Sequence, residues 1–186
     1  MALILASQSP RRKELLAYIT PDFTVKVSDA DETLDGSLSP EEAVKYLARI
    51  KGEAVAKNFC NDTVISADTV VVSDNCVLGK PRSPDEAFTM LRMLSGRTHS
   101  VFTGVCIINP DKKICFAEKT LVTFTELSDE EINAYIMTGE PFDKAGGYGI
   151  QGRGSVLISS INGDYYNVMG LPVAKLNKVL KENFFI

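Results

Sequence analysis

Two arginines open a predicted helix near the start of the chain, where acidic residues are the usual choice. The run Ser7-Gln8-Ser9-Pro10-Arg11-Arg12 follows an apolar stretch; Ser9 is suited to cap a helix and Pro10 to occupy its first position. A helix N-terminus carries a partial positive charge and unpaired N–H groups, so cations there are unfavourable unless an anion binds. We interpret this helix start as a phosphate site formed by backbone N–H groups, the Ser7 hydroxyl and both guanidinium groups. The alternative is two solvated arginines on an ordinary surface helix.

Three other predicted helix starts carry the usual acidic residues. They begin at Ser39, Ser83 and Ser128, and each has a glutamate three residues later, which is the spacing of a capping box. Only the first helix inverts the sign of the charge, and this contrast favours anion binding there.

An aspartate interrupts the most strand-like part of the chain. Residues 63–72 form a nearly continuous β-branched run, typical of a strand covered on both faces, and Asp68 lies within it. A buried carboxylate needs a partner, so Asp68 is either a strand-end cap for a backbone N–H or a metal ligand or acid–base group. Alternation places Ser66 and Asp68 on one face and Thr69 on the other, so a pocket shared by Asp68 and Thr69 would require the strand to end or bulge.

Two more charged residues stand where a partner is needed. The helix from Ser39 has its apolar stripe at positions 44, 47, 48, 51 and 55, and position 51 is a lysine. Lys51 either extends its ammonium to the surface or points into a site that holds an anion. The acidic segment 28–37 contains Glu32 and is either a solvated loop or the source of one or two ligands for a hard cation such as Mg²⁺.

A glycine-rich segment precedes the last strand. Six of the 13 glycines fall between Gly139 and Gly154, a region that also holds Gln151, and such a loop lets backbone approach a ligand closely. The pattern is neither a dinucleotide fingerprint nor a P-loop. Lys80, after Gly79, is a weak phosphate signal. His99 is expected to be a structural hydrogen-bonding residue, because no nucleophile motif accompanies it.

The remaining pattern alternates strands and helices. Strands are expected at residues 3–6, 23–27, 63–72, 77–78, 99–108, 114–124 and 156–160, the fifth and sixth joined by a turn at 109–111, and a last helix begins at Pro172. The length of 186 residues suits one compact domain or two closely joined lobes.

Composition limits the classes of partner and the compartment. The net charge of −4 gives no overall footprint for nucleic acid, so a small phosphorylated ligand is favoured. Four cysteines without a C-x-x-C pair, beside a single histidine, do not form a zinc set and are interpreted as buried thiols of a reducing compartment. No apolar run approaches the ~18 residues of a membrane span, and we expect a cytoplasmic protein.

Taken together, these segments resemble the Maf family of nucleoside triphosphate pyrophosphatases, in the subfamily that acts on dTTP and UTP. The matching blocks are residues 7–16, 66–71, 79–81, 99–105, 140–152 and 167–172, in family order along the whole chain. The resemblance implies one α/β domain over residues 1–186, with an elongated, curved mixed sheet, flanking helices and two lobes around a central cleft, similar to the inosine triphosphate pyrophosphatase fold.

The resemblance also implies the reaction and its residues. It implies hydrolysis of the α,β phosphoanhydride with a divalent cation, Mg²⁺ or Mn²⁺; the alternative is a non-catalytic nucleotide-binding regulator linked to septum formation. A homodimer is implied by the resemblance alone. Asp68 matches the proton acceptor of the family. The phosphate and metal cluster of the family is matched by Ser7, Arg12, Glu32, Lys51 and Lys80. Its base-specificity positions are matched by Arg11, Thr69 and Gln151.

Overall fold

The computed structural model describes residues 2–33 and 38–184 and divides the chain into two compact units. Unit 1 comprises Met1–Asp68, Thr103–Glu118 and Gly170–Ile186, and unit 2 comprises Thr69–Phe102 and Lys119–Met169. The predicted acidic loop therefore falls partly outside the described residues, which resume after position 37.

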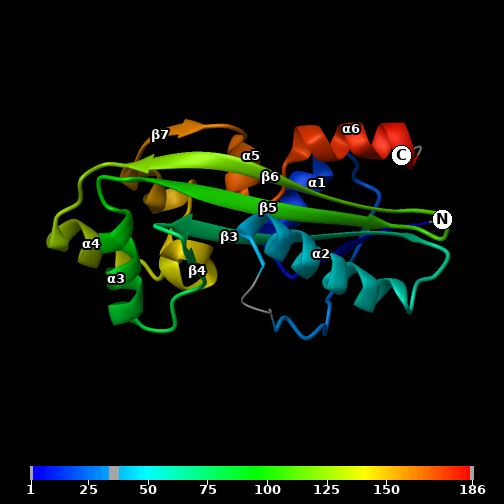
Figure 1. The fold of residues 1–186 in the computed structure, drawn as a ribbon, viewed down its shortest axis with the longest axis horizontal. Helices are drawn as coiled ribbons and strands as arrows, with labels where there is room; N and C mark the ends of the chain where they lie inside the picture. Colours follow the sequence, from blue (N-terminus) through cyan, green and yellow to red (C-terminus); the bar gives the residue numbers. More distant parts are fainter. Residues whose placement is uncertain (1, 34–37, 185–186) are drawn as a thin grey trace. The chain divides into compact units, whose positions relative to one another are not determined.

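The strands form a seven-stranded mixed sheet in the order β2-β1-β3-β5-β6-β7, with β4 paired to β3 (Figure 1). Their bounds are β1 Leu3–Ala6, β2 Thr24–Lys26, β3 Thr63–Ser73, β4 Cys76–Leu78, β5 Thr98–Ile108, β6 Lys113–Phe124 and β7 Ile158–Asn162. Strand β1 is parallel to β2 and β3, whereas the β3–β4 and β6–β7 pairs are antiparallel. The expected mixed α/β fold is confirmed. Strand β7 begins two residues later than expected, because residues 152–157 form a 3₁₀ turn instead.

The helices begin largely where the serine caps predict. Their bounds are α1 Pro10–Ala17, α2 Pro40–Ala56, α3 Pro84–Leu94, α4 Asp129–Ile136, α5 Tyr165–Met169 and α6 Val173–Asn183, with 3₁₀ turns η1 Glu140–Asp143, η2 Ala145–Gly147 and η3 Gly152–Leu157. Both reciprocal capping-box bonds form at Ser39 and Ser128. At Ser83 only one forms, because the Glu86 carboxylate accepts instead from the Arg82 N–H at 2.7 Å. Among the described helices, none is long and apolar enough to cross a bilayer.

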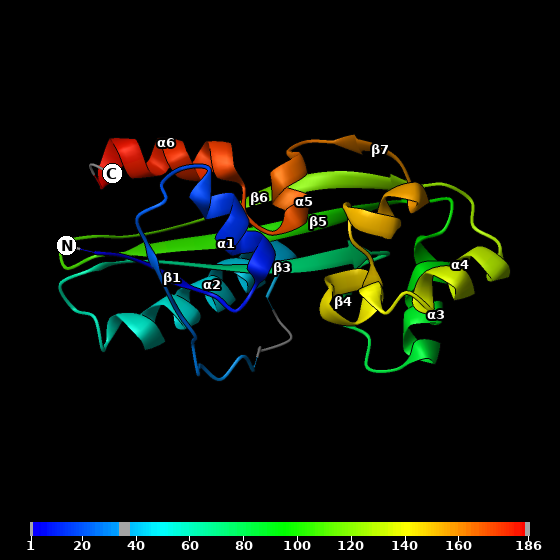
Figure 2. The ribbon, with the colours of Figure 1, turned by 180° about the vertical axis from the view of Figure 1, so that it is seen from behind.

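In unit 1, helices α1 and α2 cover opposite faces of the sheet. Helix α2 lies in front of the strands in Figure 1, and α1 lies in front of them in the reverse view of Figure 2. Helix α2 packs unusually close: a Cβ at Gly104 would lie 2.2 Å from the Val44 carbonyl oxygen, and a Cβ at Gly52 would lie 2.6 Å from Ser66 Oγ. The fully buried Ser66 hydroxyl donates to the Ala48 carbonyl at 2.6 Å, which joins β3 to α2.

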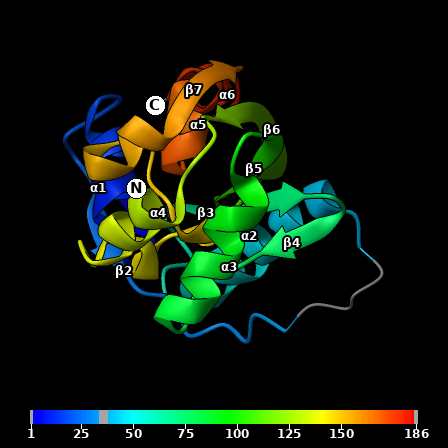
Figure 3. The same cartoon turned by 90° about the vertical axis from the view of Figure 1, so that its left-hand side faces the viewer.

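In unit 2, helices α3 and α4 pack side by side over a separate apolar core (Figure 3). Four apolar residues of α3 face this core and are buried: Ala87, Met90, Leu91 and Leu94. An aromatic cluster of His99, Phe124 and Tyr148 continues this core, with ring centroids 4.7–5.3 Å apart and edge-on contacts.

The cysteines do not follow the prediction that all four are buried thiols. Cys106 and Cys115 are joined as a disulfide, with Cα atoms 4.1 Å apart, and Cys60 and Cys76 are exposed thiols. The reason is the hairpin of β5 and β6. Its turn is closed by the Asn109 N–H donating to the Lys112 carbonyl at 2.9 Å, and this places the two cysteines directly across from each other.

Candidate active site

Helix α1 begins as the sequence predicts. Ser9 Oγ accepts a hydrogen bond from the Arg12 N–H at 3.4 Å, and the first turn contains no acidic residue. The buried Ser7 Oγ accepts from the Ser9 N–H at 3.2 Å. The Ser7 hydroxyl and the residues Arg11 and Arg12 are thus held within one turn of the helix N-terminus.

The Arg12 side chain is fixed by a contact that joins distant parts of unit 1. Its Nε donates to the Gly170 carbonyl at 2.8 Å, across 158 positions of sequence. Burial lowers the pKa of Arg12 below its usual value, and the nearby carboxylates of Asp68 and Glu32 act in the opposite direction. An arginine remains charged under such shifts. The same two carboxylates therefore share their electrostatic environment with a guanidinium at the start of α1.

Lys51 lies between two carboxylates. Its Nζ is 2.6 Å from Asp68 Oδ1 and 2.9 Å from Glu32 Oε2. The side chains of Lys51 and Asp68 are only 14% and 13% exposed, whereas that of Glu32 is 56% exposed. The Lys51 ammonium therefore does not extend to the surface, which was one of the two predicted alternatives, but points towards charged partners inside unit 1.

Secondary structure accounts for this meeting of charges. Asp68 and Ser66 share one face of β3 by alternation, and both contact α2, through Lys51 and through the Ala48 carbonyl. Strand β3 continues to Ser73, so Thr69 points to the opposite face. The side chains of Asp68 and Thr69 therefore lie on opposite faces of β3, and the boundary between the two units falls between these two residues.

Unit 2 carries the three other predicted site residues, Thr69, Lys80 and Gln151. Lys80 is exposed just after β4, and the preceding Gly79 carbonyl accepts from the Gly146 N–H of the glycine-rich loop at 2.9 Å. Gln151 is exposed in the same loop, immediately before η3. The segment around Lys80 and the loop that holds Gln151 are thus joined through backbone within unit 2.

His99 is structural, as expected. It is 2% exposed, and its Nε2 lies 2.6 Å from the Tyr148 hydroxyl. Burial lowers the pKa of His99 to about 4, so the ring is neutral at pH 7. Burial also raises the pKa of Tyr148, which keeps its hydroxyl protonated.

The donor set of unit 1 fits a divalent cation only in part. In the described residues, no cluster of three or more His, Cys, Asp or Glu side chains could hold a metal ion. Glu32 and Asp68 do contact one common cation, the Lys51 ammonium, so their oxygens face the same point. Mg²⁺ is commonly held by one or two carboxylates together with water and substrate phosphates. These two residues therefore suit a cation that arrives with a phosphorylated substrate.

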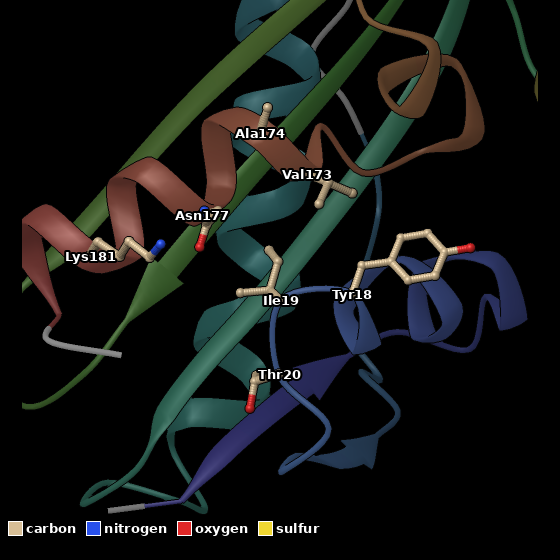
Figure 4. A pocket seen from close by; sticks show the side chains of 7 residues that line it. All are labelled: Tyr18, Ile19, Thr20, Val173, Ala174, Asn177 and Lys181. Carbon is tan, nitrogen blue, oxygen red and sulfur yellow. The ribbon is translucent and has the colours of Figure 1, made fainter.

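A pocket of about 430 Å³ lies elsewhere in unit 1, between the end of α1 and α6 (Figure 4). It is lined by Tyr18, Ile19, Thr20, Val173, Ala174, Asn177 and Lys181. None of these is among the predicted site residues, so this hollow is separate from the charged cluster at the start of α1.

Three groups that hold predicted site residues in place were not found from the sequence. The Gly170 carbonyl that holds Arg12 could not be inferred, because a backbone group leaves no signal in residue type. Tyr135 and Glu140 were not among the predicted site residues either. Tyr135 bonds to the backbone on the N-terminal side of Gln151, and Glu140 bonds to the backbone on its C-terminal side. The one signal for Glu140 is an acidic residue directly before Pro141 at the start of that loop.

Comparison with solved structures places the fold with Ham1 proteins. The chain matches the structure of the Staphylococcus aureus Ham1 protein with a TM-score of 0.50 and 19% identity, over 97% of this chain and 89% of that one. It matches a HAM1 protein from Coxiella burnetii with a TM-score of 0.54 and 14% identity, over 97% and 98%. At these identities the likeness concerns the α/β fold alone.

The sequence is more specific. The family model described as Maf-like protein matches residues 2–183, and the chain belongs to this family. Curated proteins from Bacillus cereus and Bacillus mycoides, each named dTTP/UTP pyrophosphatase, are 51% identical over 180 residues. Each match covers 97% of this chain and 94% of the relative. The resemblance stated from the motifs is thereby confirmed.

Proposed function

We propose that this protein hydrolyses dTTP and UTP between the α- and β-phosphates, releasing the nucleoside monophosphate and pyrophosphate. The observation that carries the proposal is the Lys51 ammonium held between Asp68 and Glu32 beside the arginine-rich start of α1. The names of the relatives that are 51% identical support the choice of substrates.

The positive groups bind the triphosphate. Arg11 and Arg12 stand at a helix N-terminus without acidic neighbours in its first turn, where backbone N–H groups and guanidinium forks both favour phosphate oxygens. The Ser7 hydroxyl and the Lys80 ammonium are assigned to the same task. A protein of net charge −4 must concentrate positive charge locally to hold so negative a ligand.

Asp68 orients the attacking water and accepts its proton. The water oxygen forms a bond to the α-phosphorus while the bond from that phosphorus to the bridging oxygen breaks, and pyrophosphate leaves with the electron pair. Lys51 fixes the Asp68 carboxylate from one side through the 2.6 Å contact and offsets charge that accumulates on the phosphates.

Glu32 and Asp68 are the residues that would hold a divalent cation. Mg²⁺ or Mn²⁺, when bound, would supply a Lewis acid for the phosphate oxygens and lower the pKa of a coordinated water. Arg11 and Gln151 are assigned to selecting the pyrimidine base. The family resemblance assigns Thr69 to the same task, although its side chain lies on the face of β3 opposite to Asp68. The Gln151 amide offers one acceptor and two N–H donors, which suits the N3–H and the adjacent carbonyl of uracil or thymine.

A panel assay tests the reaction. The purified protein is incubated with Mg²⁺ or Mn²⁺ and each common nucleoside triphosphate, and pyrophosphate is resolved from orthophosphate. We expect pyrophosphate from dTTP and UTP, its loss in Asp68→Asn, and normal rates in the control Asp111→Asn, whose side chain lies on the exposed turn between β5 and β6. Tight nucleotide binding without turnover would instead leave the non-catalytic regulator.

We further propose that the substrate is the free nucleotide and not nucleic acid, and that the protein acts in the cytoplasm. The acidic net charge supports the first statement. Salt-sensitive binding to single-stranded DNA, measured by fluorescence anisotropy, would contradict it.

A further inference from the structure

The residue assigned to base selection stands on a segment that needs outside support. Gln151 is exposed, lies between glycines at positions 149 and 152, and directly precedes the short turn η3. Its amide can distinguish uracil from other bases only if the backbone that carries it is held in place, because specificity requires donors and acceptors at fixed positions. The local sequence supplies little stiffness of its own.

Glu140 supplies that support on the C-terminal side of Gln151. Its Oε1 accepts from the Arg153 N–H at 3.1 Å, and its Oε2 accepts from the Gly154 N–H at 3.3 Å. A Cβ at Gly152 would lie 2.9 Å from the same Oε1, so the carboxylate packs directly against the residue that follows Gln151.

Tyr135 and Lys144 complete the frame. The buried Tyr135 hydroxyl accepts from the Gly149 N–H at 3.2 Å, on the N-terminal side of Gln151, and its pKa is raised first by burial and then in part by the nearby Glu140 carboxylate. The Lys144 ammonium donates to the Glu140 carbonyl at 2.7 Å, which fixes the backbone of the glutamate itself. Glu140 and Tyr135 thus hold the two ends of the segment that presents Gln151, one on each side.

We propose that Glu140 is a positioning residue for base selection. It acts through the backbone of residues 152–154 and through Tyr135, and it contacts no substrate. This inference rests on the proposed function, because it takes Gln151 to be the residue that reads the base. An ordinary capping role would stabilise the loop without changing which nucleotide is preferred.

The test compares kcat and KM for UTP and CTP in Glu140→Ala, Glu140→Gln, Gln151→Ala and the double variant Glu140→Ala/Gln151→Ala. The two bases differ in the hydrogen-bonding groups at positions 3 and 4, so their kcat/KM ratio reports base reading. We expect Glu140→Ala to lower the UTP preference about tenfold, mainly through KM, because two backbone N–H bonds to a carboxylate are lost. Glu140→Gln, which keeps one acceptor, recovers part of the preference.

The double variant shows whether the two residues act as one. If Glu140 acts through Gln151, the double variant is no less selective than Gln151→Ala alone. The matched control is Glu130→Gln, an exposed glutamate on α4, which leaves the ratio unchanged. Far-UV circular dichroism shows whether each variant folds; if Glu140→Ala does not, the ratio in Glu140→Gln decides.

The outcomes separate this inference from the function on which it rests. Absence of UTP hydrolysis in the unaltered protein overturns the proposed function. A loss of preference in Gln151→Ala together with an unchanged ratio in both Glu140 variants overturns the positioning role alone. Equal loss of activity on UTP and CTP in Glu140→Gln also overturns it, because that result indicates a structural role only.

Discussion

The contact between Lys51 and Asp68 contributes to stability as well as to the proposed chemistry. The side chains of Lys51 and Asp68 are only 14% and 13% exposed, and their charged atoms are 2.6 Å apart. Removing one partner of a buried ion pair costs about 3–5 kcal/mol, because the remaining charge is left without compensation. Lys51 keeps a second partner in Glu32 at 2.9 Å, so we expect Asp68→Asn to lower the free energy of unfolding by about 3 kcal/mol, the lower end of that range.

Glu32 provides the internal comparison. Its side chain is 56% exposed, and an exposed ion pair contributes about 0–1 kcal/mol. Glu32→Gln should therefore cost about 0.5 kcal/mol or less, although its carboxylate is almost as near to the same ammonium. A control on α2, the helix that carries Lys51, is Lys45→Met, whose partner Glu41 is exposed. This change should also alter the free energy of unfolding by no more than about 0.5 kcal/mol.

The assay is urea denaturation at pH 7, followed by far-UV circular dichroism, since the chain has no tryptophan. The double variant Lys51→Met/Asp68→Asn should cost about 2 kcal/mol less than the sum of its two single variants, because each single change already breaks the pair. Equal costs for Asp68→Asn and Glu32→Gln, or additive costs in the double variant, would refute the reasoning from burial.

Three further outcomes follow from other contacts. The unfolded protein binds more protons than the folded one between the ordinary His99 pKa of 6.5 and its folded value of about 4. The contribution of neutral, buried His99 to the free energy of unfolding is therefore complete above pH 6.5 and decreases by about 3 kcal/mol as the pH falls to 4. His99→Gln should remove this share of the pH dependence of stability, measured by urea denaturation at a series of pH values. Thiol titration of the native protein without reductant should find two reactive groups, Cys60 and Cys76, because the other pair is bonded. Gly104→Ala should lower the melting temperature by more than 5 °C, which in a chain of this length is roughly the effect of 2 kcal/mol, whereas Gly79→Ala, with open space around its Cβ position, should not.

Each of these outcomes has a result that contradicts it. Identical pH profiles with and without His99 would show that its burial is not coupled to folding. Four reactive thiols in the native protein would show that Cys106 and Cys115 are not joined. A stable Gly104→Ala variant would show that α2 does not pack against β5 as closely as described.

The unusual charges are the part of the candidate site that sequence reasoning singled out. Lys51 on an apolar helix stripe and Asp68 within an apolar strand each required a partner, and the structure pairs them with each other. Burial cost makes such residues visible one at a time. Their pairing could not be deduced, because the sequence does not state which helix face meets which strand.

The missed features depend on register and on backbone groups. Cys106 and Cys115 become neighbours only once the hairpin turn fixes which residues face each other. Arg12 donates a hydrogen bond to the backbone carbonyl of Gly170. Every residue has such a carbonyl, so the residue type does not reveal this contact. Helix α5, Tyr165–Met169, is too short for hydrophobic periodicity to reveal it.

The close packing at Gly52 has a consequence for protein engineering. Programmes that raise thermostability commonly replace glycine in the middle of a helix by alanine, since this gains about 1 kcal/mol where the site is open. Position 52 directly follows Lys51, and a methyl group there would lie only 2.6 Å from the Ser66 hydroxyl oxygen. The replacement that helix propensity favours in α2 would therefore disturb the Ser66–Ala48 hydrogen bond that joins α2 to β3, so helix propensity alone is a poor guide at this position.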